Sequence, residues 1–387
     1  MTPAARVAAA IEVLDAWLGG VALERALTNW ARAHRFAGSK DRAAIRDHVF
    51  DAARCRRSCA ALGGAETGRG LMIGALREAG VPLGEVFSGE GYAPAPLAPG
   101  EGAGAAWADL PEAVRFDCPD WLEAPLRASL GADFAPVMEA LRHRAPVFLR
   151  VNLAKGAREA AKAALAAEGI ETQPHPLSAT ALEVRAGARR VQASAAYREG
   201  LVELQDAASQ AVVDLLPVAP GARVLDFCAG GGGKALALAA RGARVTAHDA
   251  DPGRMSDLPA RAARAGAGIA VLAPGERPAA AGYDLVLADA PCSGSGAWRR
   301  SPEGKWRLTP VKLDELRAIQ ASILDEITAF IAPGGGLAYA TCSLIEAENG
   351  DQIAAFLSRH PGWRVSAERR FTPRDGGDGF YVAHLTR

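Results

Sequence analysis

Two cysteines stand where predicted strands end. Cys292 lies in the run YDLVLADAPCSGSG (283–296), and Cys342 lies in the run GGGLAYATCSLIEAEN (334–349). Each follows a short apolar run closed by Gly, Pro or Ser, which is typical of a buried parallel strand that ends in a loop. Catalytic sites of open α/β sheets lie beyond such strand ends. Two thiols at that edge, one of them close to Asp289, predict covalent chemistry on an electrophilic ring.

A glycine-rich loop follows another predicted strand and begins a helix. It is the run DFCAGGGGK (226–234), with glycines at 230–233 that let the backbone approach a ligand closely. Asp249 ends the next strand, where an acid can accept both hydroxyls of a ribose. NAD and S-adenosylmethionine sites share this pattern, but a dehydrogenase has no use for two strand-end cysteines. A phosphate-binding P-loop is disfavoured because Cys228 replaces its first glycine and no Ser or Thr follows Lys234.

Methylation of cytosine at carbon 5 is a reaction that would use these groups. Carbon 5 becomes nucleophilic enough to take a methyl group only after a thiolate adds to carbon 6, and a proton donor near nitrogen 3 stabilises the developing charge. A base then removes the carbon 5 proton. Cys342, Cys292 and Asp289 supply this set, and Lys234 could orient Asp289. The residues alone leave the two thiols interchangeable, and an unstacked base in RNA is the expected substrate.

A parallel sheet is needed to position these groups. From 217 to 387, apolar runs alternate with amphipathic stretches, which is typical of βαβ units. We therefore expect an α/β fold with a Rossmann-like methyltransferase sheet and a C-terminal hairpin at its edge. The expected strands cover 223–230, 244–251, 269–274, 283–291 and 335–343.

Three further segments precede this domain. Residues 1–75 carry apolar side chains three and four apart and are expected to form an all-helical domain. Residues 76–118 are rich in Gly, Pro and Ala and are expected to form a linker. Residues 119–216 mix helix and strand patterns, so we expect a small α+β module that binds RNA.

Composition excludes several classes of protein. The chain has 387 residues, 49% of them hydrophobic, enough for two or three domains with buried cores. Its first residues include Glu12 and Asp15, so neither a signal peptide nor a spanning helix is expected. Six cysteines without a CxxC pair predict no disulfide framework, and Cys55 and Cys59 lack the further ligands of a zinc site. We expect a monomeric cytoplasmic protein without metal.

The net charge of zero means that any surface for a polyanion must be local. Arg299, Arg300 and Lys305 follow directly on the first cysteine loop. We expect these three side chains to contact RNA.

With these motifs the chain resembles the RsmB/Nop/Sun (Fmu-type) family of RNA cytosine-5 methyltransferases. The resemblance runs from Pro119 to the C-terminus through FLRVNLAKGARE, LVELQDAASQAV, RVLDFCAGGGGK, TAHDADPGRM, DLVLADAPCSGSGAWRRSPEGKW, LAYATCSLIEAENGDQI and DGFYVAHL. It implies that Cys342 is the nucleophile and that Cys292 assists product release. It also places S-adenosylmethionine on Cys228, Ala229, Gly230, Gly231, Gly232, Gly233, Lys234, Asp249, Arg254 and Asp289. The first 75 residues resemble the NusB-type RNA-binding domain of the bacterial RsmB branch.

Two departures from the family pattern concern the cofactor. The family's loop usually has Ala-Pro-Gly-Gly-Lys-Thr, whereas this chain has AGGGGKA (229–235) and so lacks the rigidity of a proline. The family also carries an acid after its third strand, where this chain offers Glu276 as a substitute. The expected function is methylation of cytosine in small-subunit ribosomal RNA. The alternatives are the same chemistry on transfer RNA, or an inactive RNA-binding assembly factor.

Overall fold

The computed structural model describes all 387 residues, and they form two compact units. The first unit consists of Met1–Arg144 and Trp298–Arg307, and the second of Ala145–Ala297 and Leu308–Arg387. The chain therefore leaves the second unit directly after the loop of Cys292, contributes a short segment to the first unit, and returns. These boundaries differ from the expected ones, because 76–144 cluster with the N-terminal helices.

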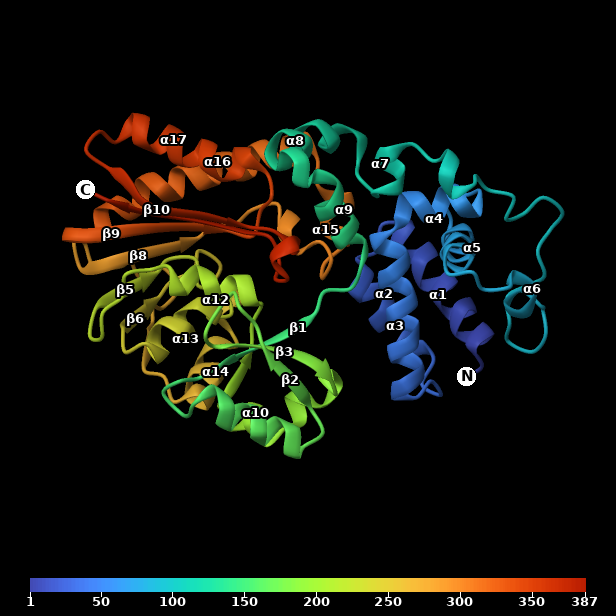
Figure 1. Cartoon of the computed structure of the whole chain (residues 1–387), viewed down its shortest axis with the longest axis horizontal. Coiled ribbons are helices and arrows are strands. Elements are labelled where there is room, and N and C mark those ends of the chain that lie inside the picture. The colour runs from blue at the N-terminus through green and yellow to red at the C-terminus, as the bar shows by residue number, and fades with distance from the viewer. The chain divides into compact units, whose positions relative to one another are not determined.

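The first unit is built from helices (Figure 1). Its longer helices are α1 Pro3–Leu18, α2 Leu23–Ala33, α3 Ser39–Arg54, α4 Arg56–Gly63, α5 Gly68–Glu78, α8 Asp120–Leu130 and α9 Phe134–Arg142. Its short helices are α6 Leu83–Val86, α7 Glu112–Arg115 and α15 Glu303–Arg307, with 3₁₀ turns η1 Trp107–Asp109 and η2 Gly131–Asp133. Helix α1 begins where the Thr2 side chain accepts a hydrogen bond from the Ala5 amide. Its buried face carries Val7, Leu14 and Trp17, at helical spacing.

The expected linker at 76–118 is packed rather than free. Phe87 is 2% exposed and belongs to the core of the helical unit, and Leu110 is 5% exposed. The Arg69 side chain of α5 forms an ion pair with Glu101. Apolar burial of this kind holds irregular backbone against the helices, which composition alone did not indicate.

The second unit begins with the small α+β module. Its four strands form an antiparallel sheet in the order β2-β3-β1-β4. The elements are β1 Val147–Val151, α10 Arg158–Ala167, β2 Glu171–Pro174, β3 Ala181–Ala186, η3 Ala188–Ala193, α11 Ala195–Arg198 and β4 Val202–Leu204. This β-α-β-β-α-β order is that of a ferredoxin-like fold.

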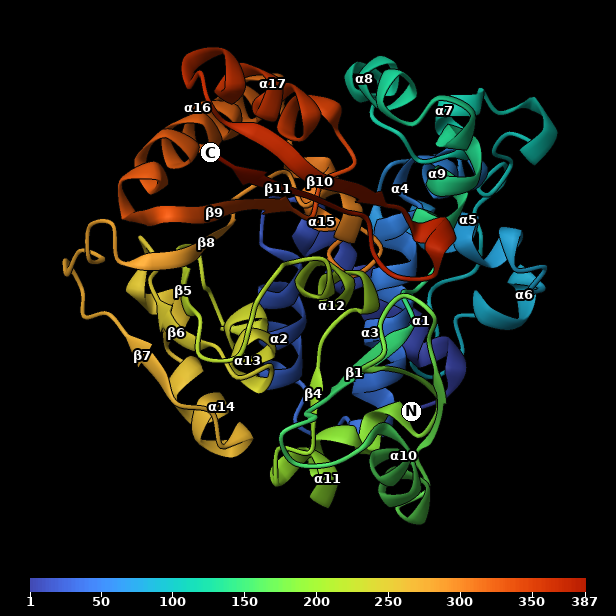
Figure 2. The same ribbon diagram turned by 60° about the vertical axis from the view of Figure 1, so that its left-hand side comes forward.

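The larger sheet has seven strands in the order β10-β11-β9-β8-β5-β6-β7 (Figure 2). The strands are β5 Arg223–Asp226, β6 Arg244–Ala247, β7 Ile269–Val271, β8 Tyr283–Asp289, β9 Ile331–Thr341, β10 Arg364–Phe371 and β11 Phe380–Thr386. The pairs among β5 to β9 are parallel, whereas β10 and β11 form an antiparallel hairpin at the edge beside β9. The expected α/β sheet, its weak third strand and its closing hairpin are confirmed.

Helices cover both faces of this sheet (Figure 1). They are α12 Ala207–Asp214, α13 Gly233–Ala240, α14 Leu258–Ala265, α16 Pro310–Ile327 and α17 Gly350–Arg359; 3₁₀ turns are η4 Pro252–Met255, η5 Ser295–Ala297, η6 Thr328–Phe330, η7 Glu346–Glu348 and η8 Pro373–Asp375. Strand β8 shows how the faces divide. Leu285 and Leu287 pack with α12 and α13, while Val286 packs with α16 and α17. Burial on both faces explains why the strands are continuous apolar runs.

No helix has the length and apolar character needed to cross a bilayer. No cluster of three or more His, Cys, Asp and Glu side chains is arranged to hold a metal ion.

Candidate active site

Predicted site residues, together with Asp226, which was not among them, gather at the carboxyl ends of the parallel strands. Asp226 ends β5, Asp249 follows β6, Asp289 ends β8 and Cys342 follows β9. Strands β5, β6, β8 and β9 are neighbours in the sheet, so their ends meet at one edge. This is the edge where open α/β sheets bind ligands.

The glycine loop is shaped by positive φ angles. Gly230 has φ +49° and Gly232 has φ +77°, and a Cβ at Gly232 would collide with the Leu258 side chain. The Gly230 amide donates to Asp249 Oδ2 at 2.9 Å, so the loop and the acid of the next strand are joined directly. Arg254 lies 3.3 Å from the same carboxylate. Glycine is required at these positions because other residues rarely adopt such angles.

A cavity of about 520 Å³ adjoins this loop. Of the predicted cofactor residues, Cys228, Asp249 and Arg254 line it, and so does Glu276, the acid suggested as a substitute after the third strand. The remaining loop residues and Asp289 are not part of its lining. Its apolar wall includes Phe227, Pro291, Ile319 and Ile323, which sequence reasoning missed. Ile319 remains 43% exposed on α16, a feature that the fold reveals and the sequence does not.

Lys234 and Asp289 form the ion pair that the sequence suggested. Lys234 Nζ donates to Asp289 Oδ2 at 2.6 Å. The lysine is only 6% exposed and its ammonium also lies over the Phe380 ring, 4.9 Å from its centre. Asp289 is 33% exposed, so one face of the carboxylate is open to a ligand. The geometry fixes the Asp289 carboxylate and leaves it accessible.

Asp226 lies at the start of the same loop, and its fully buried carboxylate has no hydrogen bond of good geometry, the Ala235 amide being a weak donor to it. Burial, with the nearby charge of Asp289, raises the pKa of Asp226 to about 7. Desolvation disfavours the ionised form of a carboxyl group, which is the cause of this change. The sequence placed Asp226 in the loop but did not indicate that it is fully buried with so little hydrogen bonding.

The two predicted catalytic thiols lie side by side. Cys292 Sγ is 3.5 Å from Cys342 Sγ, and both side chains are partly buried. The contact with Cys342 and burial raise the pKa of Cys292 well above its usual range. Cys292 is therefore a thiol that keeps its proton near neutral pH, whereas Cys228 is a packing residue whose pKa is raised by burial. The pair is positioned for one sulfur to pass a proton to the other.

Two of the three predicted RNA contacts are contradicted. Arg299 is 5% exposed and Lys305 is 1% exposed, and both belong to the helical unit. Lys305 Nζ donates to the Arg54 carbonyl at 3.0 Å, while Arg54 Nε donates to the Arg299 carbonyl at 2.6 Å. Burial lowers the pKa of Lys305. The Lys305 side chain and the Arg299 backbone thus link segments of the helical unit, and the burial of both side chains argues against their predicted contact with RNA. Arg300 is half-buried, and its contact with RNA stays a prediction.

Comparison with known proteins identifies the family. Residues 213–386 match the model of the 16S rRNA methyltransferase RsmB/F family, and 118–192 match its ferredoxin-like domain. The ribosomal RNA small subunit methyltransferase B of Erwinia tasmaniensis is 35% identical over 289 residues, which cover 70% of this chain and 66% of that protein. The corresponding protein of Citrobacter koseri is also 35% identical over 289 residues, covering 71% of this chain and 67% of that protein.

A solved structure supports the fold over the whole chain. The crystal structure of PH0851 has a TM-score of 0.77 and 22% identity, covering 100% of this chain and 99% of that one. The strand order, the cavity beside the glycine loop and the sequence matches all indicate the same family of methyltransferases. The chain belongs to the RsmB/F family of S-adenosylmethionine-dependent methyltransferases.

Proposed function

We propose that this protein methylates carbon 5 of a cytosine in small-subunit ribosomal RNA, through a covalent bond between Cys342 Sγ and carbon 6 of the base. The observation that carries the proposal is the pair of thiols 3.5 Å apart, next to strand ends that present the Lys234–Asp289 ion pair. The names of the curated relatives support ribosomal RNA as the target.

The methyl donor has a fitting place in the cavity beside the glycine loop. Asp249 lies at the end of β6, where it can accept the ribose hydroxyls, and the apolar walls formed by Phe227, Ile319 and Ile323 suit an adenine ring. Glu276 also lines this cavity and is the acid that would accept from that ring's amino group. When bound, S-adenosylmethionine would supply a methyl group on a positively charged sulfur.

The protein groups balance the bonds and protons of the reaction. The Cys342 thiolate forms the bond to carbon 6, and nitrogen 3 takes a proton shared by Lys234 and Asp289, so that carbon 5 gains the electrons it needs. After carbon 5 is methylated, its proton passes to Cys292 as Cys292 gives its own proton to the departing Cys342 sulfur. The electrons of the carbon 5–hydrogen bond then restore the ring double bond, and nitrogen 3 returns its proton. Cys342 finally releases to water the one proton that the overall reaction produces, which restores its thiolate.

Cysteine variants test this assignment. We expect Cys342→Ala to abolish methyl transfer, and Cys292→Ala to accumulate an RNA–protein adduct that survives a denaturing gel. Full turnover by Cys342→Ala would overturn the assignment of the nucleophile. Bisulfite sequencing of total RNA from a deletion strain would identify the cytosine, and a transfer-RNA position would replace ribosomal RNA as the target.

An inactive assembly factor is the remaining alternative, since the glycine loop departs from the family pattern. Calorimetric titration with S-adenosylmethionine separates the two. Binding supports the enzyme, and no binding up to millimolar concentrations would support the assembly factor.

A further inference from the structure

Between the loops of the two thiols lies a buried carboxylate that has no role in the proposed reaction. Glu348 ends the turn η7 and is 0% exposed. Burying a carboxylate is costly unless its oxygens are hydrogen-bonded. The hydrogen-bond partners of Glu348 should therefore explain why a carboxylate is buried beside the catalytic edge of the sheet.

Four donors surround the Glu348 carboxylate. Oε1 accepts from the Ser293 amide at 2.8 Å and from Gln320 Nε2 at 3.0 Å. Oε2 accepts from Ser293 Oγ and from Ser343 Oγ, each at 2.5 Å. These four bonds use the full accepting capacity of a carboxylate.

The identity of the two serines gives this arrangement its meaning. Ser293 directly follows Cys292, and Ser343 directly follows Cys342. One carboxylate thus joins the loop of one thiol to the loop of the other, although the two loops lie 50 residues apart in the chain. The Ser293 and Ser343 hydroxyls also lie 3.3 Å apart, which closes a small polar ring between the two loops.

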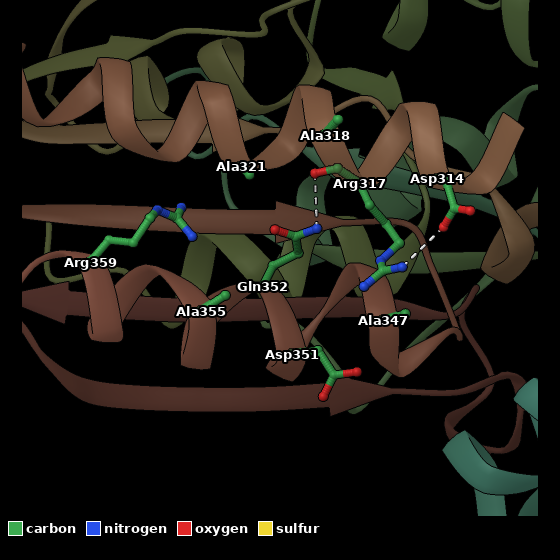
Figure 3. Close-up of a pocket in the computed structure, with 9 residues that line it drawn as sticks. All are labelled: Asp314, Arg317, Ala318, Ala321, Ala347, Asp351, Gln352, Ala355 and Arg359. Carbon is green, nitrogen blue, oxygen red and sulfur yellow. Dashed lines mark hydrogen bonds and ion pairs between the residues drawn. The ribbon is translucent and has the colours of Figure 1, made fainter. Parts of the chain in front are cut away.

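The backbone that carries Glu348 is itself fixed. The Tyr339 hydroxyl donates to the Glu348 carbonyl at 2.8 Å, and the neighbouring Asn349 side chain donates to the Ser343 carbonyl at 3.0 Å. Helix α17 begins just after it, and Gln352 of α17 donates to the Arg317 carbonyl of α16 (Figure 3). Gln320, which bonds the carboxylate, lies about one turn further along α16.

We infer that Glu348 is a positioning residue that sets the separation and orientation of Cys292 and Cys342. Resting on the proposed function, this role explains how two loops without regular structure hold two sulfurs in contact. Glu348 does not touch the base; it acts through Ser293 and Ser343. Proton transfer between the thiols depends on this spacing, because a displacement of about 1 Å can cost about 100-fold in rate.

Three substitutions separate positioning from general stability. Glu348→Ala removes all four acceptor contacts. Glu348→Gln keeps them in another form, because the amide oxygen can accept from Ser293 and Gln320 while the amide nitrogen donates to the two hydroxyls. Asp351→Asn, an exposed carboxylate at the start of α17, is the matched control.

The first readout is the rate at which Cys292 and Cys342 form a disulfide in oxidised glutathione, measured by mass spectrometry of the linked peptides in the full-length protein. The sulfurs must approach from 3.5 Å to about 2.05 Å for this bond to form. We expect wild-type rates in Glu348→Gln and Asp351→Asn, and at least about a tenfold lower rate in Glu348→Ala. A wild-type rate in Glu348→Ala would overturn the inference.

The second readout is steady-state methylation. For Glu348→Ala we expect kcat to fall about 100-fold while KM for S-adenosylmethionine stays within about twofold, since the carboxylate lies outside the cofactor cavity. Should Glu348→Ala not fold, Ser343→Ala removes one donor alone and is expected to change both readouts in the same direction; unchanged values in it would refute the inference. If the wild type forms the disulfide but does not methylate RNA, the proposed function fails while the positioning role stands.

Discussion

The buried Asp226 carboxyl group makes the stability of the methyltransferase unit depend on pH. Its pKa is raised to about 7 from the usual 3.8, because burial and the charge of Asp289 disfavour the ionised form. The folded protein therefore holds a proton that the unfolded chain releases between about pH 4 and pH 7. Folding stability falls as the pH rises through this window and becomes constant above it.

The size of the effect follows from the two pKa values. At about 1.36 kcal/mol per pKa unit, the free energy of unfolding loses about 4 kcal/mol in full, and about 3 kcal/mol between pH 5 and pH 8. For a unit of this size that corresponds to roughly 6–12 °C in Tm. Asp226→Asn removes the titrating group while keeping the shape of the side chain. Between pH 5 and pH 8, the stability of Asp226→Asn relative to the wild type should therefore increase by about 3 kcal/mol.

Differential scanning calorimetry without added cofactor provides the measurement. The transition that moves when S-adenosylhomocysteine is added belongs to the methyltransferase unit, so it can be followed alone. Asp257→Asn, at an exposed carboxylate of the same unit, serves as the control, and its Tm should depend on pH as that of the wild type does. If Asp226→Asn also ran parallel to the wild type from pH 5 to pH 8, the argument from burial would be refuted.

Two further substitutions test the packing of each unit. Arg142→Met removes the guanidinium that lies 2.9 Å from the Asp117 carboxylate, which is 0% exposed and keeps only the more remote charge of Lys305. The helical unit should lose about 3 kcal/mol of stability, measured by denaturant unfolding with tryptophan fluorescence. An unchanged midpoint would contradict the role of this pair. Gly232→Ala places a side chain at a positive φ and against Leu258. The substitution should lower the stability of the methyltransferase unit by about 2 kcal/mol or more and weaken S-adenosylmethionine binding in calorimetric titration. Wild-type affinity would show instead that the loop adapts.

The parts of the site that the sequence predicted are those governed by local pattern. Strands closed by Pro-Cys and Thr-Cys marked Cys292 and Cys342, and parallel strands bring their carboxyl ends together. The contact between Lys234 and Asp289 followed from the same rule, since β5 and β8 are neighbours. Periodicity and topology are sufficient for such predictions.

The parts that the sequence did not predict depend on tertiary burial. Arg299 and Lys305 lie in the charged run RRSPEGKW (299–306), whose composition favours an exposed loop. Lys305 is nevertheless buried, and the hydrogen bond from its ammonium group to the Arg54 carbonyl compensates part of the cost. Glu348 likewise lies in a polar stretch, and nothing local indicates that Ser293 and Gln320, from distant segments, converge on it together with the nearby Ser343.

The segment Trp298–Arg307 has a consequence for the order in which the protein is made. Its Trp298 and Lys305 side chains are almost fully buried within the helical unit, whose other residues end at Arg144. During synthesis, the contacts between this segment and the first 144 residues can form only after the segment is translated, more than 150 residues later. At about 5–20 residues per second that interval is roughly 10–30 s. The apolar core of the N-terminal helices, whose buried members lie between Val7 and Phe87, can form before then, whereas the Ala53 and Arg54 carbonyls receive their hydrogen bonds from Trp306 and Lys305 only after the segment is made.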